Sequence, residues 1–354
     1  MNQWSVIGSN SFDSLGHFDC TNPYAPSAQS FFRLLADAPT NGFDFGHVGF
    51  ADTGFNLTGG AGGPVVTVTT GEELNDWSDS NSNVVIQVSG TLTVVGMSTH
   101  VRPNKTVIGL GTNAMLQGGG LYLYNSSNVI IRNITIKGST DDNIGITSGA
   151  NHVWVDHCTF LDSADGGVDI VKGADYVTVS WCKFYYSSPS LSHRLVSLVG
   201  ASDSEGNLDQ GKLHVTYHHN WWSTNCDQRM PSVRFGRAHV FNNYYNPTGN
   251  LYCVRSRLYA ECLVENNYFE SVHNPWEVFT TPAGGTMGKI WATNNIQVNT
   301  SFSGGDDGDD NTVVIVPGTN PVFTPPYAYT LTPAASVPAL VMENAGAGRG
   351  PYKP

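Results

Sequence analysis

A short motif recurs through the middle of the chain at a nearly constant spacing. In each copy a small, polar or apolar residue is followed two positions later by an aromatic or apolar residue. The first positions of successive copies are 24, 24, 38, 23 and 24 residues apart. The six copies are Ile134-Thr135-Ile136, Cys158-Thr159-Phe160, Cys182-Lys183-Phe184, Asn220-Trp221-Trp222, Asn243-Tyr244-Tyr245 and Asn267-Tyr268-Phe269. A fixed period of about 20–50 residues indicates a repeat architecture in which each unit stacks on the next.

The residues between the copies indicate which repeat this is. Most copies follow a short strand pattern, such as His152-Val153-Trp154-Val155, and the corners are rich in Gly and Asn. Leucine ladders and helical periodicity are both missing from the sequence, which argues against leucine-rich and helical repeats. The pattern therefore predicts an all-β protein, a right-handed parallel β-helix of the solenoid kind.

Stacked coils bring equivalent residues into ladders, because paired strands lie about 4.8 Å apart. We expect Asn220, Asn243 and Asn267 to form an asparagine ladder inside the barrel, with the aromatic residues two positions later stacked in the core. Cys158 and Cys182 share one rung, where a disulfide and a pair of free thiols are both possible. Cys253 and Cys262 form a second candidate pair.

The whole chain, 1–354, is predicted to form one β-helix domain. Its cap would occupy about 1–80, its coils about 81–300, and its tail about 301–354, packed along the outside. Helical patterns cover Ser30–Ala38 and Thr70–Ser78, and one of these helices is expected to cap the open N-terminal end of the coils. The gap of 38 residues in place of 24 predicts an extra loop of roughly 14 residues within Ser187–Gln210, on the binding face.

Composition limits the partners and the location of the protein. Only 13% of residues are charged, against about 25% in soluble domains. A net charge of −12 argues against nucleic acid, which is bound through excess Lys and Arg. Membrane spans need about 18 consecutive apolar residues, and the sequence has no such run. Disulfides among the six cysteines would fit a secreted, extracellular protein. The start lacks the features of a signal peptide, which we expect to have been removed. We expect the protein to be a monomer.

Acidic and basic residues fall within one window of the repeat. Measured back from the next motif copy, Asp142, Asp165 and Asp169 lie 16, 17 and 13 positions before it, and Arg229 and Arg234 lie 14 and 9 before it. In stacked coils these five side chains would share one face. Converging carboxylates supply the hard oxygen ligands that Ca²⁺ prefers. As isolated residues, the same aspartates would be typical of turns.

Five sequence motifs occur in an order that matches a known family. They are Asn104-Lys105-Thr106-Val107-Ile108-Gly109, Val153-Trp154-Val155-Asp156-His157, Asp165-Gly166-Gly167-Val168-Asp169-Ile170, Tyr176-Val177-Thr178-Val179-Ser180-Trp181 and Arg229-Met230-Pro231-Ser232-Val233-Arg234-Phe235-Gly236. Over about Gly59 to Phe269 the chain resembles the pectate lyases of the pectin lyase-like superfamily, of polysaccharide lyase family 1 type. The resemblance implies a polysaccharide lyase that cleaves de-esterified polygalacturonate by Ca²⁺-assisted β-elimination.

The resemblance also assigns roles to residues. Asp142, Asp165 and Asp169 match the calcium-binding positions, and Arg229, the first arginine of the R-x-P-x-x-R motif, matches the base. Arg234 matches an arginine that binds the substrate carboxylate. Lys172 is a further candidate for a groove cation, with a solvated lysine as the alternative. Because arginine ordinarily stays protonated, the base role predicts activity that rises above about pH 8.

One position departs from the family pattern. Where the family has a lysine five residues before a glycine, this chain has Leu195 before Gly200. The neighbouring Arg194 could supply the missing charge if the strand carries a bulge, because in a regular strand it would point the opposite way.

Three other functions stay open from the sequence. A pectin lyase acts on methylated polymer and typically lacks the calcium carboxylates. A glycoside hydrolase would need a carboxylate pair placed for acid and base catalysis. A catalytically weak carbohydrate-binding β-helix is favoured only by Leu195.

Overall fold

The computed structural model describes residues 45–96, 98–279, 286–306, 312–314 and 322–353. These residues belong to one compact unit, Phe43–Pro354. The helix predicted at Ser30–Ala38 and the residue Cys20 lie outside the described residues. The division into cap, coils and tail therefore stays a prediction.

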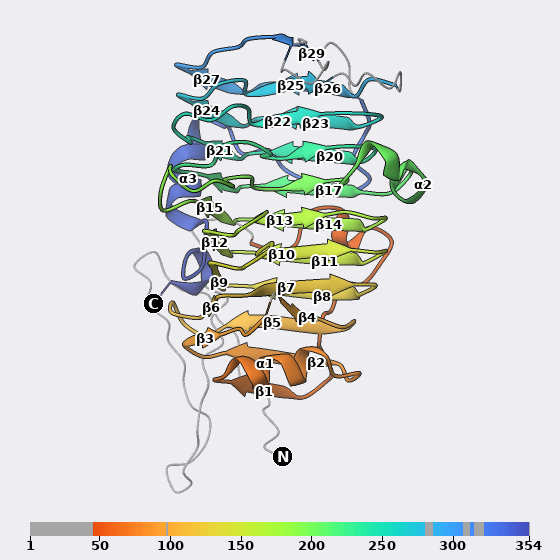
Figure 1. The fold of residues 1–354 in the computed structure, drawn as a ribbon, viewed down its shortest axis with the longest axis vertical. Coiled ribbons are helices and arrows are strands. Elements are labelled where there is room, and N and C mark those ends of the chain that lie inside the picture. Colours follow the sequence, from red (N-terminus) through yellow and green to blue (C-terminus); the bar gives the residue numbers. More distant parts are fainter. Residues whose placement is uncertain (1–44, 97, 280–285, 307–311, 315–321, 354) are drawn as a thin grey trace, which may run out of the picture. The chain divides into compact units, whose positions relative to one another are not determined.

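Three sheets form this unit, and from β4 onwards each coil passes through sheet 2, sheet 1 and sheet 3 in that order (Figure 1). Sheet 1 contains β1 (Val65–Val68), β2 (Val84–Val88), β5 (Lys105–Gly109), β8 (Ser127–Arg132), β11 (Asn151–Asp156), β14 (Asp175–Ser180), β17 (His214–His218), β20 (Arg237–Phe241), β23 (Glu261–Glu265) and β26 (Lys289–Thr293). Sheet 2 contains β4 (Ser98–His100), β7 (Gly120–Tyr124), β10 (Ile144–Thr147), β13 (Val168–Ile170), β16 (Leu198–Val199), β19 (Ser232–Val233), β22 (Val254–Ser256), β25 (Trp276–Phe279), β29 (Thr312–Val314) and β28 (Gly305–Asp306). Sheet 3 contains β3 (Thr91–Thr93), β6 (Met115–Gln117), β9 (Thr135–Lys137), β12 (Thr159–Leu161), β15 (Lys183–Tyr185), β18 (Trp221–Trp222), β21 (Tyr244–Tyr245), β24 (Tyr268–Glu270) and β27 (Ile296–Val298).

Strand pairing is parallel throughout the stack, apart from the antiparallel pairs that β29 makes with β25 and β28. Alternation along each strand places Val153 and Val155 of β11 in the core, over Val177 and Val179 of β14. The predicted parallel β-helix is confirmed.

Helices are few and short. They are η1 (Phe50–Asp52), α1 (Gly71–Ser78), η2 (Asp203–Glu205), α2 (Gly206–Asp209), η3 (Ala334–Ser336), α3 (Val337–Asn344) and η4 (Gly350–Tyr352). Thr70 and Glu73 form a capping box that starts α1, and Leu74 of this helix joins the core beside β1, β2 and β4. Helix α3 packs Val337 and Val341 on Tyr244 of sheet 3. None of the helices in the described ranges is long and apolar enough to cross a membrane.

The predicted ladders are present. The side-chain amide of Asn220 donates to Oδ1 of Asn243 at 3.0 Å, and Asn243 donates to Asn267 at 3.0 Å. The ladder continues to Asn295, which accepts from Asn267 at 3.0 Å and was missed because no aromatic residue follows it two positions later. These amides also bond the backbone, which satisfies buried polar groups at the corner.

A parallel stack of rings fills the core beside this ladder. Phe160, Phe184, Trp222, Tyr245 and Phe269 stack in sequence, with neighbouring ring centroids 4.5–5.8 Å apart. The predicted aromatic stack is therefore confirmed.

The five cysteines of the described residues are free and buried. The backbone N–H of Cys158 points at Sγ of Cys182 at 3.5 Å, so this rung holds two stacked thiols. Of the two alternatives open from the sequence, the free thiols are the one observed.

The extra residues of the long repeat divide between two corners of one coil. Asp169 and its partner Leu198 on the next coil are 29 residues apart, and Cys182 and Asn220 are 38 apart, where a regular coil has 24. Five additional residues thus precede β16, and nine follow it, in the segment that contains η2 and α2. Both segments overlap the predicted range Ser187–Gln210, but they form two loops where one was expected.

Candidate active site

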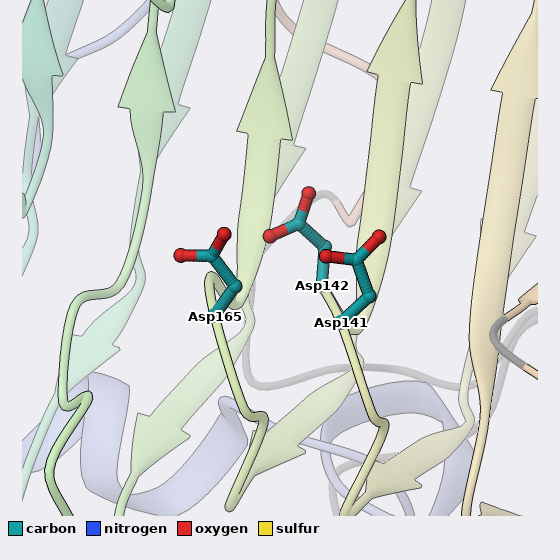
Figure 2. A group of neighbouring side chains, drawn as sticks. All are labelled: Asp141, Asp142 and Asp165. Atoms are coloured by element: carbon teal, nitrogen blue, oxygen red, sulfur yellow. The ribbon is translucent and has the colours of Figure 1, made fainter.

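Three carboxylates meet at the corner that leads into sheet 2. Asp141 and Asp142 lie between β9 and β10, and Asp165 lies at the equivalent place one coil later, between β12 and β13. One carboxylate oxygen from each lies within 4.8 Å of the others (Figure 2). Figure 2 shows the three side chains projecting from adjacent coils into a common space. Two of the three metal ligands predicted from the sequence, Asp142 and Asp165, therefore belong to a group that could hold a metal ion.

Gly166 connects this cluster to Asp169, the third predicted ligand. The Gly166 N–H donates to Oδ1 of Asp142 at 2.7 Å. A Cβ atom at position 166 would lie 2.3 Å from Oδ1 of Asp169 and 2.7 Å from Oδ1 of Asp142. Both carboxylates therefore abut the bare Cα of this glycine. Asp169 is held in place on β13 because it accepts the Leu198 N–H at 3.0 Å.

Asp141 was missed by the sequence reasoning. The repeat spacing identified Asp142, and the adjacent Asp141 was not considered as a ligand. The adjacency of two aspartates at the same corner was the signal that could have identified it.

The electrostatics of the cluster favour the uptake of a cation. Burial raises the pKa of Asp142 to about 7, and the negative charges of Asp141 and Asp165 add to this shift. Burial also raises the pKa of Asp169 well above its usual range, with a further contribution from Asp142. The Gly166 N–H and the charge of Arg229 oppose the shift at Asp142. A bound cation would remove the repulsion between these groups.

Arg229 is the predicted base, and it lies in the corner between β18 and β19. Its charge lowers the pKa of both Asp142 and Asp169, which places its guanidinium in the electrostatic field of the cluster. The side chain is half-buried and makes no hydrogen bond or ion pair with the rest of the described chain. Its carbonyl oxygen accepts the Ser197 N–H at 2.7 Å, which fixes the backbone.

Arg234 lies at the end of β19 and is bonded within the protein. Its Nε donates to Asp203 Oδ1 at 2.5 Å, and its Nη1 donates to the Gly200 carbonyl at 3.0 Å. Asp203 belongs to η2, in the second part of the insertion, and also lies 3.6 Å from Nη2 of Arg257. The insertion thus orients Arg234, an interaction that spacing alone did not predict.

Among the described residues, neither of the two further predicted cations, Arg194 and Lys172, makes a hydrogen bond or ion pair with a carboxylate of the cluster. Arg194 donates to the Asn225 carbonyl at 2.8 Å and lies 3.7 Å from Asp227, and Lys172 is exposed at the opposite end of β13 from Asp165. Leu195 is 7% exposed and lies outside the core cluster, whereas its neighbour Val196 belongs to it. Leu195 is thus a buried apolar residue outside the core cluster and brings no charge to this position.

The sequence matches the family described as pectate lyase over residues 34–350. The chain belongs to the pectate lyase family. As a member of this family it is a polysaccharide lyase, as predicted. The pectate trisaccharide-lyase of Bacillus licheniformis is 33% identical over 320 residues, covering 86% of this chain and 87% of that protein. The pectate trisaccharide-lyase of Thermotoga maritima is 37% identical over 341 residues, covering 89% and 90%.

Solved structures of pectate lyases share the fold. The crystal structure of a pectate lyase from Bacillus sp. N165 in complex with trigalacturonate has a TM-score of 0.71 and 30% identity, and the match covers 86% of this chain and 99% of that one. Pectate lyase II from Xanthomonas campestris has a TM-score of 0.69 and 26% identity, with 86% and 99% covered. Both matches extend over nearly the full length of those enzymes.

Proposed function

We propose that this pectate lyase family member cleaves de-esterified polygalacturonate by β-elimination, with Ca²⁺ held by Asp142, Asp165 and Asp169, and with Asp141 as a fourth carboxylate. The observation that carries the proposal is the convergence of these carboxylates around Gly166. The relative from Bacillus sp. N165 binds trigalacturonate, which is a fragment of this polymer.

The donor set fits calcium. All the proposed ligands are carboxylate oxygens, and they come from two adjacent coils. Ca²⁺ prefers such oxygen ligands, whereas softer metals prefer nitrogen and sulfur. Gly166 leaves room that a side chain would fill. When held by Asp141, Asp142, Asp165 and Asp169, calcium would act as a Lewis acid towards a bound substrate, which would make the proton on C5 more acidic.

Arg229 is proposed to accept the C5 proton. Without an internal hydrogen-bond partner in the described structure, its guanidinium is available to the substrate, and the backbone bond to Ser197 restricts its position. The electron pair of the C5–H bond forms a C4=C5 double bond as the C4–O4 bond breaks, which leaves an unsaturated sugar at the new non-reducing end. O4 leaves with the other fragment and takes up a proton from water, which forms the new reducing end. Arginine loses its proton only with difficulty, because its ordinary pKa is above about 12. We therefore expect activity to rise above about pH 8.

Arg234 is proposed to bind the carboxylate of the sugar that reacts. Asp203 and Gly200 engage Nε and Nη1, and Nη2 has no hydrogen-bond partner among the described residues. A fixed arginine can stabilise charge that develops on the substrate without reorganising during the reaction. Arg194 and Lys172 stay candidate groove cations of lower importance, since neither is bonded to the carboxylate cluster in the described residues.

The test is the ultraviolet absorbance of the unsaturated product formed from polygalacturonate, measured with Ca²⁺ and with EDTA. We expect activity that EDTA abolishes, and a loss of at least about a thousandfold in kcat for Arg229→Ala. Arg237→Ala, which removes an exposed arginine paired with Glu261 on sheet 1, is the matched control and should retain activity. Activity on highly methylated pectin that is insensitive to EDTA would favour a pectin lyase instead.

Secretion is part of the same proposal. Pectic polymers are too large to enter a cell, so an enzyme that cleaves them acts outside it. Recovery of the activity from the medium of the source cells, and not from their contents, is the expected result. The monomeric state stays a prediction, to be checked by light scattering.

A further inference from the structure

Two tyrosines on β7 form an exposed pair of rings. Tyr122 is 40% and Tyr124 53% exposed, and they alternate with Leu121 and Leu123, which are fully buried. Alternation along the strand places both rings on the outer face of sheet 2. Their centroids are 6.4 Å apart and their planes differ by 20°, so the rings lie nearly parallel. Neither hydroxyl has a hydrogen-bond partner in the part of the chain that the structure describes.

Tyr122 belongs to the same row of outward positions as the metal cluster. The strand register pairs Tyr122 with Gly145 of β10, and Gly145 with Asp169 of β13. These three strands follow one another in the stack (Figure 1). At the spacing of paired strands, Tyr122 and Asp169 lie about 10 Å apart along the row.

No side chain separates the ring from the cluster, because the residue between them is a glycine. A Cβ atom at Gly145 would lie 3.2 Å from Cδ2 of Tyr122 and 3.6 Å from Oδ2 of Asp142. The edge of the tyrosine ring and the carboxylate therefore border the same open position. Isolated exposed aromatic residues are common on protein surfaces and need no explanation. Here the two rings lie parallel to each other, and one of them, Tyr122, is in register with Asp169 of the acidic cluster.

We propose that Tyr122 and Tyr124 form a stacking subsite for a galacturonate residue of the polymer bound at the acidic cluster. This inference rests on the proposed function. A galacturonate ring has an axial O4, which leaves the C3, C4 and C5 hydrogens together on its other face. Such a C–H face packs against the electron-rich face of an aromatic ring. One sugar residue has a length similar to the coil spacing, so a chain lying along this row would bring a second sugar over β7.

The position of the pair predicts its effect on the reaction. Tyr122 lies one coil from Asp142 and two coils from Asp169, so its ring would contact a sugar beside the one that reacts. Such a contact holds the substrate in the ground state and the transition state alike. Its removal should therefore raise KM and leave kcat unchanged. This split separates a binding subsite from a structural role, because damage to the cluster would lower kcat.

The experiment compares Tyr122→Ala and Tyr124→Ala with the wild-type protein on hexagalacturonate and polygalacturonate. We expect a rise of about tenfold in KM for Tyr122→Ala, a similar or smaller rise for Tyr124→Ala, and an unchanged kcat. Tyr122→Phe keeps the ring and should behave as the wild type. Trp77→Ala removes a ring of similar exposure, 37%, on α1 and should leave KM unchanged.

Calorimetry measures the affinity for hexagalacturonate in the Arg229→Ala variant, with and without Tyr122→Ala. This comparison tests the inference independently of catalysis. Weaker binding on adding Tyr122→Ala would support the subsite even if the proposed reaction failed. An unchanged KM and an unchanged binding affinity for Tyr122→Ala, with a normal melting temperature, would overturn the inference and leave the proposed function intact. A fall in kcat at constant KM would also contradict it.

Discussion

Gly166 gives the sharpest test of the metal site, because its missing side chain leaves space for two carboxylates. We expect Gly166→Ala to lose calcium affinity and activity while the β-helix stays folded. The added methyl group would start 2.3 Å from Oδ1 of Asp169 and 2.7 Å from Oδ1 of Asp142. Real Cβ atoms essentially never approach another heavy atom closer than 3.0 Å. Asp169 is buried and bonded to the Leu198 N–H, so its oxygen cannot simply rotate away into solvent.

The size of the effect follows from these distances. The Asp169 oxygen must move from 2.3 Å to at least 3.0 Å, which exceeds the tolerance of about 0.2 Å for metal–ligand distances. A misplacement approaching 1 Å at a reacting centre costs about a hundredfold in rate. We therefore expect Gly166→Ala to reduce kcat/KM on polygalacturonate by about a hundredfold or more at fixed Ca²⁺.

Two measurements separate loss of metal from loss of fold. Calcium should raise the Tm of the wild-type protein, since a ligand that binds only the native state stabilises it. Gly166→Ala should lose most of that increase. Gly149→Ala is the matched control. A Cβ atom at Gly149 would meet nothing within 4 Å, so this variant tests the cost of adding a methyl group without a clash. That cost comes from the φ of +79°, which is unfavourable for alanine. The control should cost about 1–2 kcal/mol of stability and keep the calcium response. A Gly166→Ala protein that keeps both its calcium-dependent Tm shift and its activity would refute this account of the site.

Three further predictions concern the groove, the ladder and the acid stability of the fold. Leu195→Lys should restore the cation of the family pattern and raise kcat on polygalacturonate by about tenfold. An unchanged or lower kcat would show that Leu195 is not in the groove. Asn243→Ala should lower the free energy of unfolding, measured in urea titrations, by about 2–4 kcal/mol. The reason is that the side-chain amide of Asn243 bonds two ladder neighbours and the carbonyls of Tyr217 and Phe241. A loss below about 1 kcal/mol would contradict the ladder's role. Burial lowers the pKa of His218 to about 3, so the unfolded chain takes up a proton below about pH 6.5 while the folded protein does not. Stability should therefore fall as the pH drops from about 6.5 towards 3, with a loss of about 2 kcal/mol from this group at pH 5, and His218→Gln should reduce that slope.

The fold could be predicted from the sequence because a parallel β-helix keeps nearly the same number of residues in each coil. Equal coil lengths preserve the register between strands, so residues with equal spacing stack. The asparagine ladder, the aromatic stack and the shared face of Asp142, Asp165 and Asp169 all follow from this one condition.

Periodicity gave less information about the corners and the insertion. Corner residues such as Asn133, His157, Trp181 and Arg229 have positive φ angles, and their side chains do not follow the alternation of a strand. Asn225, whose carbonyl accepts from Arg194, is another corner residue with a positive φ, so this contact could not be predicted from the position of Arg194 next to Leu195.

By itself, the amino-acid sequence determined the β-helix, the stacked ladders and the acidic face, because all three depend on spacing along the chain. The tertiary structure alone decided that Asp141 joins the cluster, that Gly166 makes room for Asp142 and Asp169, and that the insertion brings Asp203 to Arg234. It also decided that Tyr122 lies beside the cluster across the bare Gly145. The physical reason is that these contacts form between side chains of different coils, whose directions are set by local backbone angles and packing and not by the repeat.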